Sequence, residues 1–333
     1  MRGVLYPVVY LQLGGEFVAM PGLVSRVRER VYCVAAPFGP GGLVHCYFID
    51  APRKTIVDTG TAPVPQESLL PALREIGWDV SELRYIVNTH MHADHAGGNA
   101  ELKELSGADI HMHRADTDRV NPQAYLAAAR PDQLLLGEPE NPAAAEARVL
   151  EQLGGAWGVD RVLEDGDTID LGDDIRLQVM HTPGHTAGSA CFYWESARAL
   201  FSGDAVGGQG SRVNGYPLYS FAADYRRSLE RLLELPVDYL MQAHRYRWSG
   251  ADNPAVRHAG DVRRTIEDSL GVWHTLDEGV RSCLAENRDI TFKDLFPKVL
   301  RVVAPQLGND PDAAGTPSGA LSTIAAHWRE QLA

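Results

Sequence analysis

The sequence predicts an α/β protein of layered sheets and helices, followed by a small helical C-terminal domain. Short apolar runs alternate with helical segments as far as about residue 250, and helical spacing dominates from residue 253 onward. Of the 333 residues, 44% are hydrophobic, which is enough to bury a full core. We therefore predict a larger domain over residues 1–252 and a helical domain over residues 253–333.

The first part of the larger domain consists of apolar runs bounded by Gly and Pro, which is typical of strands. We expect strands at residues 31–36, 43–50, 55–57, 84–89 and 109–113, and helices at residues 66–76 and 98–105. In the helix at residues 66–76, leucines and an isoleucine recur on one side.

The stretch at residues 115–159 interrupts this rhythm. It is rich in Ala, Pro and Leu and contains a helical segment at residues 143–153, so we interpret it as an insertion or lid. After it we expect strands at residues 175–180, 190–194, 200–202 and 239–242, and an amphipathic helix at residues 225–235. In the tail we expect helices at residues 256–270, 276–286 and 321–332, and another that opens at residues 290–294.

Charge and cysteine content narrow the classes of ligand and compartment. The formal net charge of −13, without a dense Lys/Arg run, disfavours nucleic acid as a ligand. Four scattered cysteines form no CxxC pair and indicate a reduced, intracellular protein. The first 20 residues lack the pattern of a signal peptide, and no stretch of about 18 apolar residues is present. We expect a cytoplasmic protein without a membrane segment.

The strongest functional signal is the run Thr-His-Met-His-Ala-Asp-His at residues 89–95, directly after a predicted strand. Imidazole and carboxylate ligands suit zinc, iron or manganese. Positions two apart in an extended segment face the same way, so His90 and His92 can bind one ion, while Asp94 and His95 can reach a second. So many ligands within six residues predict a metal site rather than a solvated loop.

Four ligands in one loop cannot complete two sites that each need about three protein ligands and an open position. Three further candidates each follow a predicted strand: His185 after a Pro-Gly bend, Asp204 in Ser-Gly-Asp, and His244. Any of them alone would more often be a solvated loop residue. With the His cluster present, we expect one ion to be held by His90, His92, His185 and Asp204, and the other by Asp94, His95, His244 and Asp204.

The motifs His-x-His-x-Asp-His, Thr-Pro-Gly-His-Thr and Ser-Gly-Asp, followed by a late His, resemble the metallo-β-lactamase superfamily from about residue 30 to 250. Val-Asp-Thr-Gly at residues 57–60 fits the early motif of that family. The resemblance implies an αββα sandwich with two divalent metal ions at one edge. Zinc is the first expectation for these ions, and iron and manganese are the alternatives. The resemblance also implies that Asp58 supports the His loop rather than binding metal. The motifs are specific for the superfamily and weakly specific for substrate.

The tail is similar to that of a subgroup with a winged-helix-like C-terminal domain, which includes an endoribonuclease and fungal polyketide thioesterases. An unrelated helical cap is an equal alternative. Related folds often form dimers, so we also expect a homodimer.

In the mechanism that the resemblance implies, two ions activate a water that attacks a carbonyl, and Asp94 orients the nucleophile and passes a proton to the leaving group. Two further residues are candidate substrate contacts. Arg245 stands where many relatives have Gly and could bind a carboxylate or phosphate, and His45 stands where relatives often have Asn.

We therefore expect a metal-dependent hydrolase of a small ester, thioester or lactone. The alternatives are an endoribonuclease, an iron-dependent sulfur dioxygenase and a metal-binding module without activity.

Overall fold

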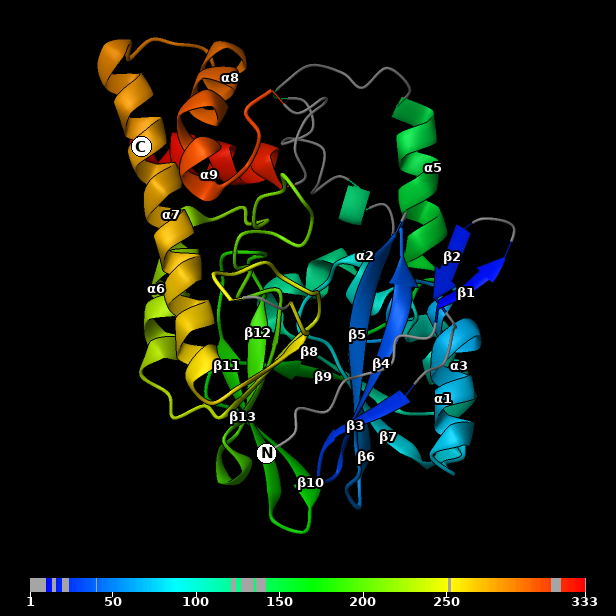
Figure 1. The fold of residues 1–333 in the computed structure, drawn as a ribbon. Coiled ribbons are helices and arrows are strands. Elements are labelled where there is room, and N and C mark those ends of the chain that lie inside the picture. The colour runs from blue at the N-terminus through cyan, green and yellow to red at the C-terminus, as the bar shows by residue number, and fades with distance from the viewer. Residues whose placement is uncertain are drawn as a thin grey trace.

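Two mixed β-sheets face each other and carry helices on both outer faces (Figure 1). The computed structural model describes residues 10–13, 16–19, 24–39, 41–120, 124–126, 135, 142–250, 253–312 and 319–332. This arrangement confirms the predicted αββα sandwich with a helical C-terminal part. The remaining residues of the predicted insertion and the predicted domain boundary at residue 252 lie outside the described ranges.

The first sheet has seven strands within the described ranges, in sequence order across the sheet. They are β3 (Val24–Arg28), β4 (Val31–Phe38), β5 (Gly42–Ile49), β6 (Lys54–Val57), β7 (Leu83–Val87), β8 (Asp109–His113) and β9 (Arg161–Leu163). Pairing is antiparallel from β3 to β6 and parallel from β6 to β9. A separate hairpin joins β1 (Tyr10–Leu13) to β2 (Glu16–Ala19).

The second sheet has six strands in the same part of the chain. They are β10 (Thr168–Gly172), β11 (Ile175–His181), β12 (Ala190–Trp194), β13 (Ala199–Gly203), β14 (Tyr239–Gln242) and β15 (Val256–His258). Among these six strands, only the β13–β14 pair is parallel. The helix α6 (Ala222–Leu233) provides the crossover that a parallel pair needs.

The other helices cover the sheets or extend beyond them. They are α1 (Leu70–Glu75), α2 (Ala93–Ala96), α3 (Asn99–Ser106), α5 (Pro142–Leu153), α7 (Gly260–Glu286), α8 (Phe292–Val303) and α9 (Ala320–Leu332). Short helical turns span Pro65–Leu69, Val80–Glu82, Arg114–Arg119, Glu195–Ala197 and Pro305–Leu307.

Three apolar layers hold the sandwich together. Between the sheets, Val57 and Val87 of the first sheet pack with Phe192 and Phe201 of the second. On the outer face of the first sheet, a second cluster joins its strands to α1 and α3. On the outer face of the second sheet, a third cluster joins its strands to α6 and to all three C-terminal helices, α7, α8 and α9. The C-terminal helices therefore share one core with the second sheet.

Most predicted elements are confirmed within a few residues, but the tail differs from the prediction. Val256–His258, expected to begin a helix, forms β15 and pairs antiparallel with β14. Alternating side chains of a three-residue strand cannot be distinguished from one helical turn by periodicity. The rest of the helix expected at residues 256–270 and the helix expected at residues 276–286 form one helix, α7, because Gly271 is tolerated within it and Val272 and Trp273 are buried.

The described part of the insertion contains helix α5, whose end lies against the loop that carries the His cluster. The carbonyl of Gln152 accepts a hydrogen bond of 2.9 Å from the amide of Ala62. A Cβ placed on Gly97, directly after α2, would overlap that same carbonyl. The insertion therefore packs closely beside the metal-binding motif.

Two expectations concern features beyond the sandwich. A winged-helix domain carries a β-hairpin, the wing, beside its helices. Within residues 259–312 and 319–332 the structure has helices and turns but no strand, so such a hairpin does not occur there. No helix in the described ranges combines the length and apolar character that crossing a bilayer requires.

We expect Phe201→Ala to lower the free energy of unfolding by about 3–5 kcal/mol, because Phe201 is fully buried between the sheets and its loss leaves a cavity. Urea denaturation followed by circular dichroism would measure this change. Leu105→Ala is the control, since Leu105 is 40% exposed and its truncation should change stability by less than about 1 kcal/mol. Equal effects of the two variants would contradict the assigned core.

Candidate metal centre

The seven predicted ligand residues meet at one edge of the sandwich. The loop after β7 and helix α2 supply His90, His92, Asp94 and His95, and the loops after β11, β13 and β14 supply His185, Asp204 and His244. Their ligand atoms form three groups within which all atoms lie within 4.8 Å of one another: His90–His92–His185, His90–His95–Asp204 and Asp94–His95–His244. The structure thus brings together residues up to about 150 positions apart in sequence.

Three imidazoles converge in the first group. The Nε2 atom of His185 lies 3.0 Å from Nε2 of His90 and 2.8 Å from Nδ1 of His92. Burial, together with the neighbouring His185, lowers the pKa of His92 to about 3, and burial lowers the pKa of His90 well below its usual value. Both rings are therefore neutral, which is the form that binds metal ions.

The third group combines the carboxylate of Asp94 with the imidazoles of His95 and His244. The Nε2 atom of His244 lies 3.0 Å from Oδ2 of Asp94, and that oxygen lies 3.6 Å from Nε2 of His95. Although burial opposes ionisation, the charges of His95 and His244 lower the pKa of Asp94 to about 2. Asp94 is therefore an ionised carboxylate at neutral pH.

The carboxylate of Asp204, which belongs to the second group, lies between the first group and the third. Its Oδ1 is 3.5 Å from Nε2 of His95, and its Oδ2 is 3.4 Å from Nε2 of His185 and 3.6 Å from Nε2 of His244. A carboxylate in this position can bridge two cations. The bridging role that the sequence predicts for Asp204 stays a prediction.

The residues present fit a pair of divalent metal ions. The Nε2 atom of His95 and the Oδ1 atom of Asp204 are fully buried and have no hydrogen-bond partner within the described part of the protein. Buried polar atoms are rarely left unsatisfied, because the loss of water is not then compensated. Nitrogen and carboxylate donors converging on one point are the chemistry of zinc and similar cations, and His and Asp clusters here are consistent with a dinuclear site.

The family to which this arrangement belongs is shown by comparison with known proteins. The family model described as "Metallo-beta-lactamase superfamily" matches residues 39–244, more than half of the chain. The chain belongs to the metallo-β-lactamase superfamily. It is a hydrolase of this fold with His and Asp residues as metal-site candidates.

Curated relatives match large parts of this hydrolase. A hydroxyacylglutathione hydrolase from Maricaulis maris is 29% identical over 70% of this chain and 71% of its own length. One from Polaromonas sp. is 28% identical over 77% of this chain and 86% of its own. An acyl-coenzyme A thioesterase from Bos taurus is 35% identical over 45% of this chain and 50% of its own.

Solved structures show the same fold at lower sequence identity. A metallo-β-lactamase family protein from Thermus thermophilus superposes with a TM-score of 0.66, at 23% identity, over 92% of this chain and 96% of the other. A class B3 di-zinc metallo-β-lactamase from an Alaskan soil metagenome superposes with a TM-score of 0.53, at 21% identity, over 76% and 92% of the two chains.

In this metallo-β-lactamase fold, Asp58 supports the segment of residues 89–95, which carries the His cluster, through hydrogen bonds. Its carboxylate accepts hydrogen bonds of 2.8 Å from the backbone amide of Thr89, from the Thr89 hydroxyl and from Nδ1 of His95. The bond to Nδ1 turns Nε2 of His95 toward the cluster and fixes the tautomer. Asp58 has a φ of +59°, an uncommon backbone conformation for a residue other than Gly.

Backbone carbonyls orient two other imidazoles in the same way. The Nδ1 atom of His185 donates to the carbonyl of Leu218 at 2.6 Å, and Nδ1 of His244 donates to the carbonyl of Leu43 at 2.8 Å. Each bond leaves Nε2 free to face the cluster.

Asp116 is a buried residue that sequence reasoning missed. Its carboxylate accepts hydrogen bonds from the Met91 amide at 3.1 Å, the Thr186 hydroxyl at 2.8 Å and the Gly188 amide at 2.9 Å. It thereby ties the loop of His90 and His92 to the loop of His185. In the sequence it belongs to the stretch interpreted as an insertion, and its own neighbours give no signal of this role.

Two tyrosines also lie beside the cluster. The hydroxyl of Tyr246 interacts with the Asp204 carboxylate, and burial together with that negative charge raises the pKa of Tyr246 well above its usual value. Tyr125, in the described part of the insertion, has its ring centroid 6.1 Å from that of His92. Tyr246 was not predicted, although it stands two residues after His244.

The two predicted substrate contacts lie outside the ligand groups. The Nδ1 atom of His45 bonds to the carbonyl of Ala243 at 2.9 Å, and burial lowers the pKa of His45 to about 4. His45 therefore adjoins the backbone that leads into His244. Arg245 is exposed, and its Nε donates to the carbonyl of Asn253 at 2.8 Å. Its role as a substrate contact stays a prediction.

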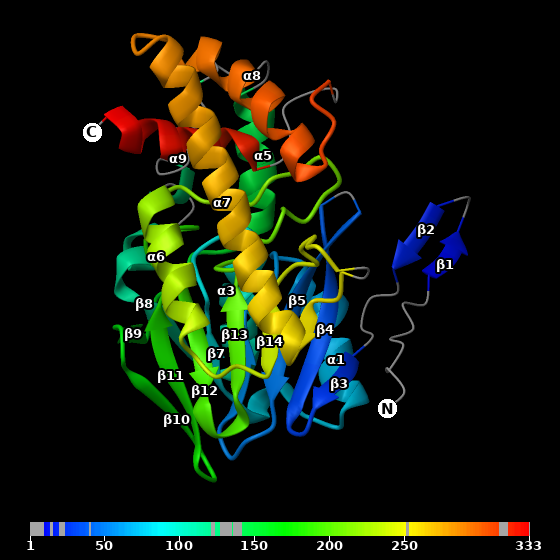
Figure 2. The ribbon, with the colours of Figure 1, turned by 60° about the vertical axis from the view of Figure 1, so that its left-hand side comes forward.

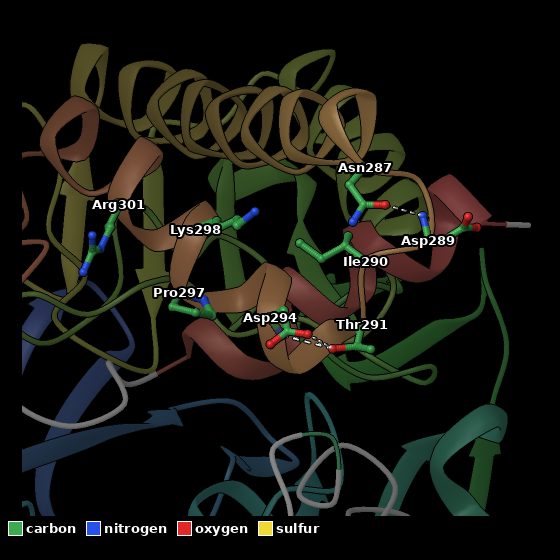
Figure 3. Close-up of a pocket in the computed structure, with 8 residues that line it drawn as sticks. All are labelled: Asn287, Asp289, Ile290, Thr291, Asp294, Pro297, Lys298 and Arg301. Carbon is green, nitrogen blue, oxygen red and sulfur yellow. Dashed lines mark hydrogen bonds between the residues drawn. The ribbon is translucent and has the colours of Figure 1, made fainter.

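A cavity of about 600 Å³ lies away from these residues, at the junction of α7 and α8 (Figure 3). It is open and is lined by Asn287, Asp289, Ile290, Thr291, Asp294, Pro297, Lys298 and Arg301. Polar groups on its wall bond to one another, such as Thr291 to Asp294. None of the seven predicted ligands contributes to it.

We expect Asp116→Asn to destabilise the protein by about 1–3 kcal/mol and to weaken metal binding about tenfold, because three buried donors lose a charged acceptor. Urea denaturation and zinc titration against a chromophoric chelator would measure the two effects. Asp118→Asn removes the same charge from an exposed position two residues later and serves as the control. If both variants bind zinc as tightly as the wild type, the bracing role of Asp116 is wrong.

Proposed function

We propose that this protein is a dinuclear zinc hydrolase that cleaves a small acyl thioester, with small esters and lactones as related substrates. The observation that carries the proposal is the position of Asp204 between two groups of buried imidazoles and carboxylates. Relatives named as hydroxyacylglutathione hydrolases and as an acyl-coenzyme A thioesterase support a thioester as the substrate class.

In the proposed centre, His90, His92 and His185 would hold one ion, Asp94, His95 and His244 would hold the other, and Asp204 would contact both. Such a pair, when bound, supplies a water of lowered pKa and a positive charge that polarises a carbonyl oxygen. His90 and His92 are already neutral and Asp94 is already ionised, as metal binding requires. Although burial opposes protonation, the neighbouring carboxylates raise the pKa of His95 and of His244, so these two imidazoles would release a proton when metal binds.

The remaining steps depend on protein groups near the cluster. Asp94 is ionised and can accept a hydrogen bond from the attacking water and then carry its proton. A carboxylate of such low pKa holds a proton only weakly, so it gives a leaving group little assistance. A thiol ionises near pH 8.5 and can leave as a thiolate without being protonated. Alkoxide or amine leaving groups need a proton from a group that is still protonated near neutral pH. This difference favours a thioester over an ester or an amide.

The alternatives differ in metal and substrate. The net charge of −13 opposes binding of RNA, so an endoribonuclease is disfavoured. An iron-dependent sulfur dioxygenase would use a similar set of ligands but would consume oxygen and contain one iron per chain.

We expect the purified protein to contain two zinc ions per chain and to hydrolyse glutathione and coenzyme A thioesters faster than matched esters, lactones or RNA. Elemental analysis of protein grown without added metal, followed by assays across this panel, would test both statements. One iron per chain with oxygen consumption would contradict the proposal, as would cleavage of RNA alone.

We expect Asp204→Asn to reduce the metal content from two ions to less than one and to lower kcat at least about 100-fold, because the amide keeps the shape but loses the charge between the ions. Elemental analysis and steady-state kinetics would measure these changes. Two bound ions with unchanged activity in this variant would refute the bridging role of Asp204.

A further inference from the structure

The segment of residues 217–221, between β13 and α6, contacts two neighbouring residues of the loop that carries the metal-ligand candidate His185. The carbonyl of Leu218 accepts the 2.6 Å hydrogen bond from Nδ1 of His185. The amides of Ser220 and Phe221 both donate to the carbonyl of Gly184, at 2.8 and 3.0 Å. The position of this segment therefore determines how the imidazole of His185 is turned.

The segment has no regular secondary structure, so its position depends on tertiary contacts. Helix α9 supplies them. The hydroxyl of Thr323 donates to the carbonyl of Pro217 at 2.5 Å and accepts from the amide of Tyr219 at 3.3 Å. The Tyr219 hydroxyl bonds to Nε2 of His327 at 2.8 Å. Thr323, Tyr219 and His327 have no exposed surface.

The imidazole of His327 is itself held in place. Its Nδ1 lies 3.4 Å from Oδ1 of Asp277 on α7, and that oxygen also accepts a 3.0 Å bond from the side chain of Gln331. The hydrogen bond from His327 lowers the pKa of Asp277, so the carboxylate is charged and accepts the Nδ1 proton. The Nε2 atom is then the acceptor for the Tyr219 hydroxyl.

The C-terminal residues approach the same loop at two further points. Gly319, next to the start of α9, has a φ of +79°, and a Cβ there would overlap the carbonyl oxygen of Tyr216. The side chain of Asn309 donates to the carbonyl of Gly215 at 3.1 Å. Figure 2 shows α9 lying across α7 above the second sheet, from which this loop emerges.

We propose that α9 is a positioning element of the metal centre. Thr323 and His327 fix residues 217–221, and this segment in turn orients His185 toward the ion that it shares with His90 and His92. The inference rests on the proposed dinuclear centre. It gives the C-terminal helices a function beyond packing, because the partner of the outer nitrogen of a metal-binding His sets the direction and the basicity of its ring.

Thr323→Val provides the test, because it removes the hydroxyl and nearly preserves the volume of the side chain. In the full-length protein, zinc titration against a chromophoric chelator should show one of two sites weakened about tenfold. The absorption spectrum of the cobalt-loaded variant should change, and the amides of Ser220 and Phe221 should exchange hydrogen faster in metal-free protein.

Three variants are matched to this one. Thr323→Ser keeps the hydroxyl and should restore zinc affinity to within about twofold of the wild type. Thr265→Val removes an equally buried hydroxyl whose bond stays within α7, to the carbonyl of Asp261, and should leave zinc affinity unchanged. Tyr219→Phe breaks the link to His327 and should weaken the same site as Thr323→Val.

The outcomes separate this inference from the proposed function. If the wild type binds two ions and Thr323→Val binds both with wild-type affinity, the positioning role is overturned and the metal centre stands. The same holds if Thr265→Val weakens zinc binding as much as Thr323→Val, since the effect would then reflect stability alone. A wild type that binds no zinc overturns the metal centre and this inference with it.

Discussion

The concentration of charge and lone pairs at one buried edge of the sandwich is the constraint on which the rest of the structure depends. At this edge, imidazoles from three loops meet the carboxylates of Asp94 and Asp204, and water is largely excluded. Carboxylates without compensation are very unfavourable in such surroundings, and neighbouring neutral imidazoles direct lone pairs at one another. Divalent cations would relieve both problems, so bound metal would stabilise this arrangement.

Holding such a cluster open for metal requires rigid supports, and these come from groups that never face the ions. Asp58 supports His95, Asp116 links two ligand loops, and the carbonyls of Leu43 and Leu218 turn two more imidazoles. Each support originates on a different element. The rigidity of the site therefore depends on the contacts that hold the two sheets, the outer helices and the C-terminal helices together.

Two additions to the strand framework, the insertion and the C-terminal helices, lie close to the ligand candidates. The metal-binding loops lie at the ends of strands in the shared fold, whereas the insertion brings α5 and Tyr125 beside the cluster. The insertion therefore adjoins the cluster without supplying any of the seven predicted ligands. The C-terminal helices contact the cluster through the His185 loop, so the two additions approach it through different segments.

The sequence by itself determined the metal-binding motif, the family and most strands, because these signals are local. Ligands within six residues are visible in a single loop, and strand alternation repeats every two residues. It could not determine that Val256–His258 forms a strand, since the partner strand decides this. Nor could it single out Asp116, Tyr246, Thr323 or His327, whose roles arise from contacts with residues far away in sequence or from burial that only folding creates. The cluster at residues 90–95 could be predicted because its ligand residues are contiguous in the sequence. The residues that support it could not be predicted, because they are brought together only by folding.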